Sequence, residues 1–312
     1  MGYGDYSYTA HTKIANSRAK KKASEVFTQR TVHPLMCPFG VGMRESRDSV
    51  DHPNSLPIIF ALDVTGSMGQ IPDQLAKAEL PHFMKALLDA GVADPQVLFM
   101  AVGDIASDHG PLQVGQFEST AEDIDRWLTW SWLEGGGGGN GCESYDLAMY
   151  FAARHTETDA IAKRGKRGYF FMTGDEKPYP YTDQSSVKRI LGDEIDTAIP
   201  LAQVCDELSR VYHPFFLVPD PGRAPAICDA WREAMGDHVV LMESPSDTCH
   251  VAAALVGLGE GHFADLSAVA KSLTAKGLER ERVNGVVRAL TPFAATLGRD
   301  GTAGPRLEAI AP

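Results

Sequence analysis

The chain has 312 residues, enough for one large domain or two smaller ones. Hydrophobic residues make up 44% of it and charged residues 22%, the balance of an ordinary globular protein, which excludes wholesale disorder. The sequence shows no apolar run of the ~20 residues that a transmembrane helix needs, and its first residues lack the basic start and apolar core of a secretory signal. We therefore expect a cytoplasmic protein with no membrane contact.

The formal net charge of −12 argues against nucleic acid as a partner. Residues 1–55 nevertheless hold eight Lys or Arg against five acids, so a basic arm and an ordinary solvated charge run both remain open. The cysteines are odd in number and widely spaced, which is unlike a secreted disulfide framework and lacks the spacing of a zinc finger. We expect reduced thiols, no zinc site and no nucleic-acid binding.

In chain order, residues 1–55 lack clear periodicity, and we expect them to form an extended N-terminal arm. Leu56–Leu62 is a short, continuously apolar run, which is typical of a central strand in a sheet covered on both faces. Apolar residues at helical spacing over Ile71–Ala90 predict a helix, which Pro81 should kink or split. Val97–Val102 predicts a second buried strand.

The rest of the chain continues this alternation of strands and helices. An edge strand is expected within Pro111–Phe117, and Ser119–Glu122 offers a capping box for the helix that follows. Further strands are expected at Gly168–Thr173, Val211–Val218 and His238–Met242, and further helices at residues 143–154, 186–209, 224–236, 248–258 and from 261 to about 297. This order predicts an α/β fold, a doubly wound, mostly parallel sheet with helices on both faces. The expected segments are the N-terminal arm (1–55), the sheet domain (56–260), and a C-terminal helical extension with a flexible tail (261–312).

Candidate ligands follow two of the expected strands. In an open parallel sheet, ligands collect at the carboxyl ends of the strands. Asp63, Thr65 and Ser67 follow the first strand, and Asp175 follows the Gly168–Thr173 strand. If these strands are neighbours, the oxygen donors share one crevice and suit Mg²⁺ or Mn²⁺. The alternative is that residues 63–67 only cap the next helix.

The run Asp63-Val-Thr-Gly-Ser-Met68 resembles the D-x-[ST]-x-S motif of von Willebrand factor A (vWA) domains, their metal-ion-dependent adhesion site, or MIDAS. The resemblance covers residues 56–260 and implies a vWA/Rossmann-like sheet. It also implies that Asp63, Thr65 and Ser67 are the metal ligands of the first loop and that Asp175 is the later carboxylate.

The chain departs from the vWA pattern in the middle loop. Most vWA sites take a Thr there, whereas this chain aligns a glycine within Gly139–Glu143. Asn140, Glu143 or a water would then supply the oxygen. The Gly135–Gly141 run lacks the G-K-[ST] of a P-loop, so a mobile loop that closes the crevice is favoured over a phosphate cradle.

The function expected is that of a non-enzymatic adaptor or regulatory subunit that grips an acidic residue of a partner protein through the metal. Asp104–Gln116, together with Asn140 and Glu143, looks most like intracellular bacterial vWA proteins, and that resemblance implies a MoxR-type AAA+ ATPase as partner. A metal-assisted hydrolase or phosphatase is the alternative. It would need a general base, and the spacing of His82 or His109 singles out neither of them as a base for a Ser67 nucleophile.

Overall fold

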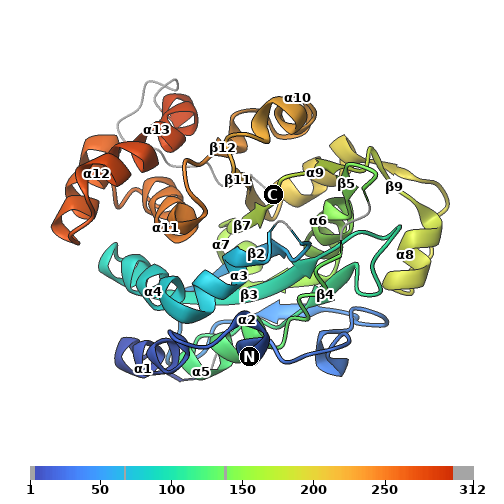
Figure 1. Cartoon of the computed structure of the whole chain (residues 1–312), viewed down its shortest axis with the longest axis horizontal. Helices are drawn as coiled ribbons and strands as arrows, with labels where there is room; N and C mark the ends of the chain where they lie inside the picture. The colour runs from blue at the N-terminus through green and yellow to red at the C-terminus, as the bar shows by residue number, and fades with distance from the viewer. Residues whose placement is uncertain (1–3, 67, 137–138, 298–312) are drawn as a thin grey trace.

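The structure is a computed structural model that describes residues 4–66, 68–136 and 139–297. Within these ranges the chain forms a six-stranded sheet with helices packed around it (Figure 1). From edge to edge its strands are β12 (Val239–Leu241), β11 (Tyr212–Val218), β7 (Gly168–Thr173), β2 (Ser55–Asp63), β3 (Asp94–Val102) and β4 (Leu112–Val114). The expected α/β fold class, a mostly parallel sheet with helices on both faces, is confirmed.

The remaining elements of the described residues are short strand pairs and helices. The paired strands are β1 (Arg44–Ser46) with β6 (Thr156–Thr158), β5 (Cys142–Glu143) with β8 (Lys177–Pro178), and β9 (Tyr181–Thr182) with β10 (Ile199–Pro200). The helices are α1 (Tyr8–Arg18), α2 (Ala23–Val26), α3 (Gln70–Gln74), α4 (Leu80–Asp89), α5 (Ala121–Thr129), α6 (Tyr145–Arg154), α7 (Asp159–Arg164), α8 (Gln184–Ile190), α9 (Leu201–Ser209), α10 (Ala224–Met235), α11 (Thr248–Gly259), α12 (Leu266–Ala275) and α13 (Arg280–Leu297). No helix in this part of the chain is long and apolar enough to span a bilayer.

Strand β2 is the centre of the sheet. It pairs in parallel with β3 on one side and with β7 on the other, and all of its residues are buried. Strand β4 runs antiparallel to β3 and forms an edge. The predictions of a central first strand and of an edge strand within Pro111–Phe117 are therefore confirmed.

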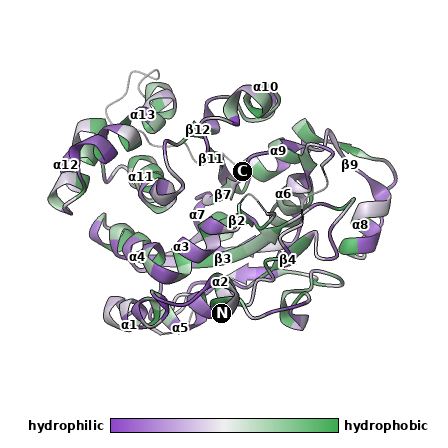
Figure 2. Cartoon of the chain, viewed as in Figure 1, coloured by the Kyte–Doolittle hydropathy of each residue, from purple (hydrophilic) through white to green (hydrophobic). Residues whose placement is uncertain are grey.

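The two faces of β2 enter two separate cores. Ile58 and Phe60 pack with residues of α4, α11 and α13, whereas Ile59 and Ala61 pack with residues of α6, α9 and α10. Successive strand residues point to opposite faces, so a strand covered on both sides has no polar face and its sequence is apolar throughout. By contrast, surface helices such as α12 and α13 mix hydrophilic and hydrophobic residues (Figure 2).

The helix expected after the first strand is divided, as Pro81 predicted. Residues Gln70–Gln74 form α3, Leu75–Glu79 form a π-helical segment (η2), and α4 begins at Leu80 with Pro81 in its first turn. Proline lacks an N–H group and fits the first turn of a helix, where that donor has no partner in any case. Leu75 and Ala76 of η2 are buried against the core.

The expectation of an extended N-terminal arm is wrong for Tyr8–Arg18, which form α1. This helix lies beside α4, α5 and η2 (Figure 1), and its Arg18 guanidinium pairs with the carboxylate of Asp125 on α5, with Nη2 donating to Oδ2 at 2.7 Å. Short helices draw most of their stability from tertiary packing. The local pattern of α1 is too weakly amphipathic to predict it.

Two helix boundaries also differ from those expected. The N-cap of α5 is Thr120 rather than Ser119, and its hydroxyl accepts from the backbone N–H of Asp123. The expected helix over residues 186–209 is two helices, α8 and α9, because the chain between them pairs as β10 with β9.

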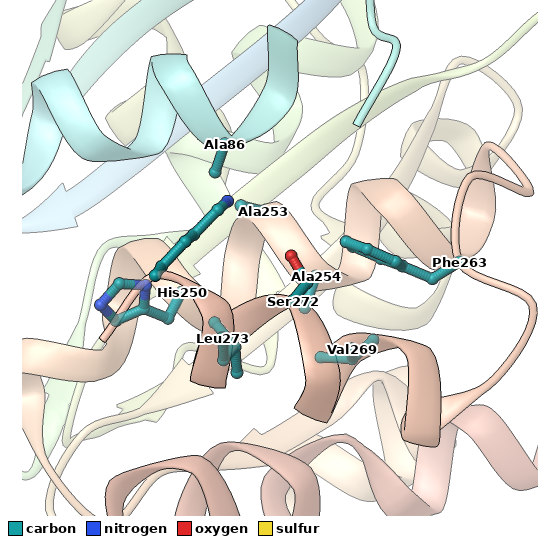
Figure 3. A pocket seen from close by; sticks show the side chains of 9 residues that line it. Ala86, His250, Ala253, Ala254, Phe263, Val269, Ser272 and Leu273 are labelled. Atoms are coloured by element: carbon teal, nitrogen blue, oxygen red, sulfur yellow. The ribbon is translucent and has the colours of Figure 1, made fainter. Parts of the chain in front are cut away.

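The C-terminal helices form a group at one end of the molecule (Figure 1). Helix α11 contacts both α4 and α13, and α12 packs on α13. A cavity of about 20 Å³ lies between α4, α11 and α12, lined among others by Ala86, Ala253 and Leu273 (Figure 3). The expected flexible tail from residue 298 onward lies outside the described residues, and the domain boundaries stay a prediction.

Candidate functional site

The structure brings Asp63 and Asp175 to the same edge of the sheet. Asp63 is the last residue of β2, and Asp175 follows β7 by two residues. The two strands pair in parallel with Leu62 opposite Thr173, so they end side by side. Both carboxylates are buried. The two strands are therefore neighbours, which was the condition for a shared crevice at this edge.

Three donors hold the Asp63 carboxylate in place. The backbone N–H and the hydroxyl of Thr65 donate to Oδ1 at 2.9 and 2.6 Å, and the hydroxyl of Tyr145 donates to Oδ2 at 2.6 Å. Burial raises the pKa of Asp63 to about 6 and the charge of Asp175 adds to the rise, while these hydrogen bonds oppose it. The hydrogen bonds hold the carboxylate in one position, but they do not fully offset the cost of burying its negative charge.

The first residues of the Gly-rich loop lie against the loop that follows β2. The backbone N–H of Gly66 donates to the carbonyl of Gly136 at 2.9 Å. A Cβ atom on Gly66 would lie 3.3 Å from the Gly135 carbonyl oxygen, and one on Gly136 would overlap the Asp108 carboxylate. At Gly66, glycine lets the two backbones approach this closely without a shift of either one. Ser67, the third predicted ligand of the first loop, lies outside the described residues, as do residues 137–138.

Glu143 is the most unusual acid at this edge. Its side chain is 2% exposed, and its Oε2 atom has no hydrogen-bond partner in residues 4–66, 68–136 and 139–297. Burial raises its pKa to about 9, with further contributions from the charges of Asp63, Asp104 and Asp108. A buried carboxylate oxygen without a partner is energetically unfavourable, and a bound cation would satisfy it.

Asn140, the other candidate for the middle position, is exposed and uses both ends of its amide. Its Nδ2 donates to the Tyr179 hydroxyl at 2.7 Å and to Asp104 Oδ2 at 3.4 Å. Its Oδ1 accepts from the backbone N–H of Cys142 at 3.0 Å. Asn140 therefore stabilises the loop, whereas Oε2 of Glu143 has no hydrogen-bond partner among the residues that the structure describes.

Sequence reasoning missed two residues that shape this site. Tyr145 donates to Asp63, although a tyrosine at the start of a helix reads from sequence as an ordinary core residue. Arg223 lies at the rim, where its Nε atom donates to the Asp175 carbonyl at 3.1 Å and its guanidinium pairs with the Glu176 carboxylate. Arg223 precedes α10, and its position in the sequence gives no signal of this role.

The donor set is partly carboxylate and partly hydroxyl. In the described ranges, no three His, Cys, Asp or Glu side chains are grouped closely enough to hold a metal by themselves. The predicted site also depends on the hydroxyls of Thr65 and Ser67, so the Mg²⁺ or Mn²⁺ site stays a prediction. Hard oxygen donors of this kind match the preference of these ions.

No protein-family model matches the sequence, and no curated protein matches it. Three solved structures with which it shares 13% identity are similar in fold. Proximal thread matrix protein 1 from the mussel byssus has a TM-score of 0.42, with 72% of this chain and 51% of that chain covered. An aerotolerance-related membrane protein from Bacteroides fragilis has a TM-score of 0.37 and coverages of 64% and 97%. A von Willebrand factor type A structure from Catenulispora acidiphila has a TM-score of 0.36 and coverages of 73% and 49%.

This chain thus spans about half the length of the mussel and Catenulispora proteins. Similarity at this level concerns the arrangement of the elements and assigns no activity. The structure of this chain itself shows two buried acidic side chains, Asp63 and Asp175, at the carboxyl ends of the neighbouring parallel strands β2 and β7.

Proposed function

We propose that the chain is a metal-dependent protein-interaction module of the vWA type. Asp63, Thr65, Ser67 and Asp175 would hold Mg²⁺ or Mn²⁺, and Glu143 would supply the oxygen that other vWA domains take from a Thr. The observation that carries this proposal is the buried Glu143 carboxylate, whose Oε2 atom has no hydrogen-bond partner in the described ranges and lies close enough to Asp63 for their charges to interact.

The electrostatics of the crevice favour a cation. Burial raises the pKa values of both Asp63 and Glu143, and neighbouring acids add to the rise: Asp175 at Asp63, and Asp63 at Glu143. Ionised carboxylates are therefore unfavourable there without a counter-charge. At an effective dielectric of ~20, two opposite unit charges at ~4 Å attract each other by about 4 kcal/mol, and a divalent ion attracts more. Metal binding would relieve this repulsion, and a bound ion would leave coordination positions for water or a partner oxygen.

The proposed ligand from outside the chain is an acidic side chain of a partner protein, which would enter the coordination sphere of the metal. We also propose, from the family resemblance, that the partner is a MoxR-type AAA+ ATPase, that the chain acts as its adaptor or regulatory subunit, and that it works in the cytoplasm. Co-purification of the tagged chain with a MoxR-type ATPase from the same cells, in Mg²⁺ but not in EDTA, is the expected result.

Isothermal titration calorimetry with MgCl₂ or MnCl₂ tests the metal site. We expect weak binding to the wild-type chain, loss of that binding in Asp63→Ala, and no change in Asp229→Ala, which removes an exposed Asp from α10. Circular dichroism would establish that both variants are folded. A folded Asp63→Ala variant that binds metal as the wild type does would contradict the assignment.

One observation favours the alternative, a metal-assisted hydrolase. The Nδ1 atom of His109 lies 2.7 Å from Oε1 of Glu134, as in a base held by a carboxylate, and His109 follows Asp108 at the edge of the crevice. The His109 side chain is 86% exposed, however, so water surrounds it and its reactivity gains little from the protein. We therefore propose a non-enzymatic role. Hydrolysis of an aryl phosphate by the purified chain, lost in Asp63→Ala, would instead support the hydrolase.

A further inference from the structure

Arg223 is carried to the edge of the crevice by the loop that follows β11. Strand β11 pairs in parallel with β7, with Leu217 opposite Thr173, so the loops after these two strands leave the sheet side by side. Asp220 holds the backbone just before α10. Its Oδ1 atom accepts from the N–H of Gly222 at 2.8 Å, and its carbonyl accepts from the N–H of Arg223 at 3.1 Å. The arginine side chain therefore starts from a fixed point beside the residues that follow β7.

The guanidinium of Arg223 lies across the two acids that follow β7. Its Nε atom donates to the backbone carbonyl of Asp175 at 3.1 Å and lies 3.6 Å from Oδ2 of the same residue. Its Nη2 atom pairs with the carboxylate of Glu176. The Asp175 side chain is only 7% exposed, so the guanidinium provides a counter-charge for a carboxylate that has little contact with water.

The two sides of this contact differ in how freely they can move. The buried Trp231 donates from Nε1 to the carbonyl of Glu176 at 3.0 Å, and the N–H of Gly174 donates to a carbonyl of β11 at 3.2 Å. The backbone around Asp175 is therefore held in place. The Arg223 side chain, by contrast, is 39% exposed and borders on solvent. The contact can thus be opened by turning the arginine into water, without moving the acid.

A metal at the proposed site would meet this guanidinium. Asp175 is one of the carboxylates through which the metal would be bound, and Arg223 already provides that carboxylate with a positive charge. Two cations a few ångströms apart repel each other, and they do so more strongly where water is excluded. The metal and the guanidinium would therefore oppose each other's binding to Asp175.

We propose that Arg223 makes an autoinhibitory contact in the metal site, where its guanidinium competes with Mg²⁺ or Mn²⁺ for Asp175. In the metal-free chain it compensates the charge of Asp175. On metal binding it would give up this contact and stay paired with Glu176. One of the chain's own side chains would thus keep the metal affinity low. This inference rests on the proposed function, because it assigns a regulator to the same metal site.

Titration of the full chain with MnCl₂ tests the competition, followed by calorimetry and by the electron paramagnetic resonance signal of free Mn²⁺. Arg223→Gln and Arg223→Met both remove the charge and should bind Mn²⁺ roughly tenfold more tightly than the wild type. Arg223→Lys keeps the charge and should stay within about threefold of the wild type. Arg232→Gln removes an exposed arginine of α10, which makes the same change in net charge, and should alter the affinity by less than about twofold.

Urea denaturation in EDTA tests the contact without any metal. Arg223→Gln should lower the urea midpoint of the metal-free chain more than Arg232→Gln does. The effect should be smaller in the Asp175→Asn background, because the neutral amide no longer needs a counter-charge. Circular dichroism would establish that the variants are folded. An effect of Arg223→Gln that is the same in both backgrounds would overturn the pairing on which the inference depends.

The outcomes of the titration separate this inference from the proposed function. Unchanged or weaker Mn²⁺ binding by Arg223→Gln and Arg223→Met, with binding by the wild type, overturns the inference and leaves the metal-dependent function standing. Binding by these variants but not by the wild type supports the competition and contradicts a metal-dependent role of the wild-type chain. Absence of Mn²⁺ binding in all of these proteins contradicts both. Equal gains in Arg223→Gln and Arg232→Gln would be an effect of net charge and would also overturn the inference.

Discussion

Glu143→Gln is the substitution that tests the electrostatics of the crevice most directly. Glutamine has the same size and shape as glutamate but cannot ionise. The side chain is almost fully buried, and its Oε2 atom has no hydrogen-bond partner in the described ranges, so the substitution breaks no hydrogen bond at that atom. Any change in stability should therefore report on the charge of Glu143 rather than on packing.

The expected difference in stability between the wild type and Glu143→Gln follows from the pKa of Glu143, which burial and neighbouring acids raise from 4.5 to about 9. Between these values the folded chain holds a proton that the unfolded chain has released, so the free energy of unfolding of the wild type falls as the pH rises. One pKa unit equals about 1.4 kcal/mol. Because Glu143 must take up a proton on folding, the free energy of unfolding of the wild type near pH 7 is lower by about 3 kcal/mol than it would be without this uptake. In metal-free buffer, Glu143→Gln should be the more stable protein by about that amount, and the difference should vanish below about pH 4.5.

Urea denaturation in EDTA across the range from about pH 4 to about pH 8 measures this difference. Added MgCl₂ should then stabilise the wild type more than Glu143→Gln, because only the carboxylate gains a counter-charge from the ion. Glu122→Gln, at an exposed glutamate of α5, is the matched control and should differ from the wild type by less than about 0.5 kcal/mol at every pH.

Two results would refute this reasoning. A difference between wild type and Glu143→Gln that does not change with pH would mean that Glu143 has an ordinary pKa in the folded chain. Equal stabilisation of both proteins by MgCl₂ would mean that the Glu143 carboxylate is not a ligand of the metal, and the middle position of the site would then belong to another donor.

Three further substitutions test the packing around the site and the C-terminal helices. Gly174→Ala should lower the free energy of unfolding in urea denaturation by about 1–3 kcal/mol. The new methyl group would overlap the buried Tyr145 hydroxyl and lie 2.6 Å from Cζ of that ring. The control Gly42→Ala has open space around the new methyl group and should be nearly neutral. Tyr145→Phe should reduce stability by about 1.5–3 kcal/mol above about pH 7 and by less near pH 4, because the lost hydrogen bond favours ionised Asp63; an equal loss at both pH values would contradict this. Ala253→Leu should lower the unfolding free energy by about 1–3 kcal/mol, since three added carbons exceed the cavity of about 20 Å³ in Figure 3, while Ala275→Leu on the exposed side of α12 should not.

The sequence by itself determined the sheet and the position of its crevice. Strands β2 and β7 are readable because a strand buried on both faces must be apolar along its whole length, and Asp63 and Asp175 are recognisable because each follows such a run. The Gly-rich loop is readable for a similar reason, since glycines allow close approach of backbones wherever they stand. These features are local, so a short stretch of sequence contains them.

Only the tertiary structure decided which side chains meet. The bond from Tyr145 to Asp63 joins residues 82 positions apart, and the pair of Arg18 with Asp125, which docks α1 on α5, spans 107 positions. The burial of Glu143 likewise depends on what packs around it. The exposure of Phe39 depends on the path that the N-terminal segment takes. Contacts over such separations are set by how the elements pack, and no periodicity or local motif in the chain records which distant residue will fill a given space.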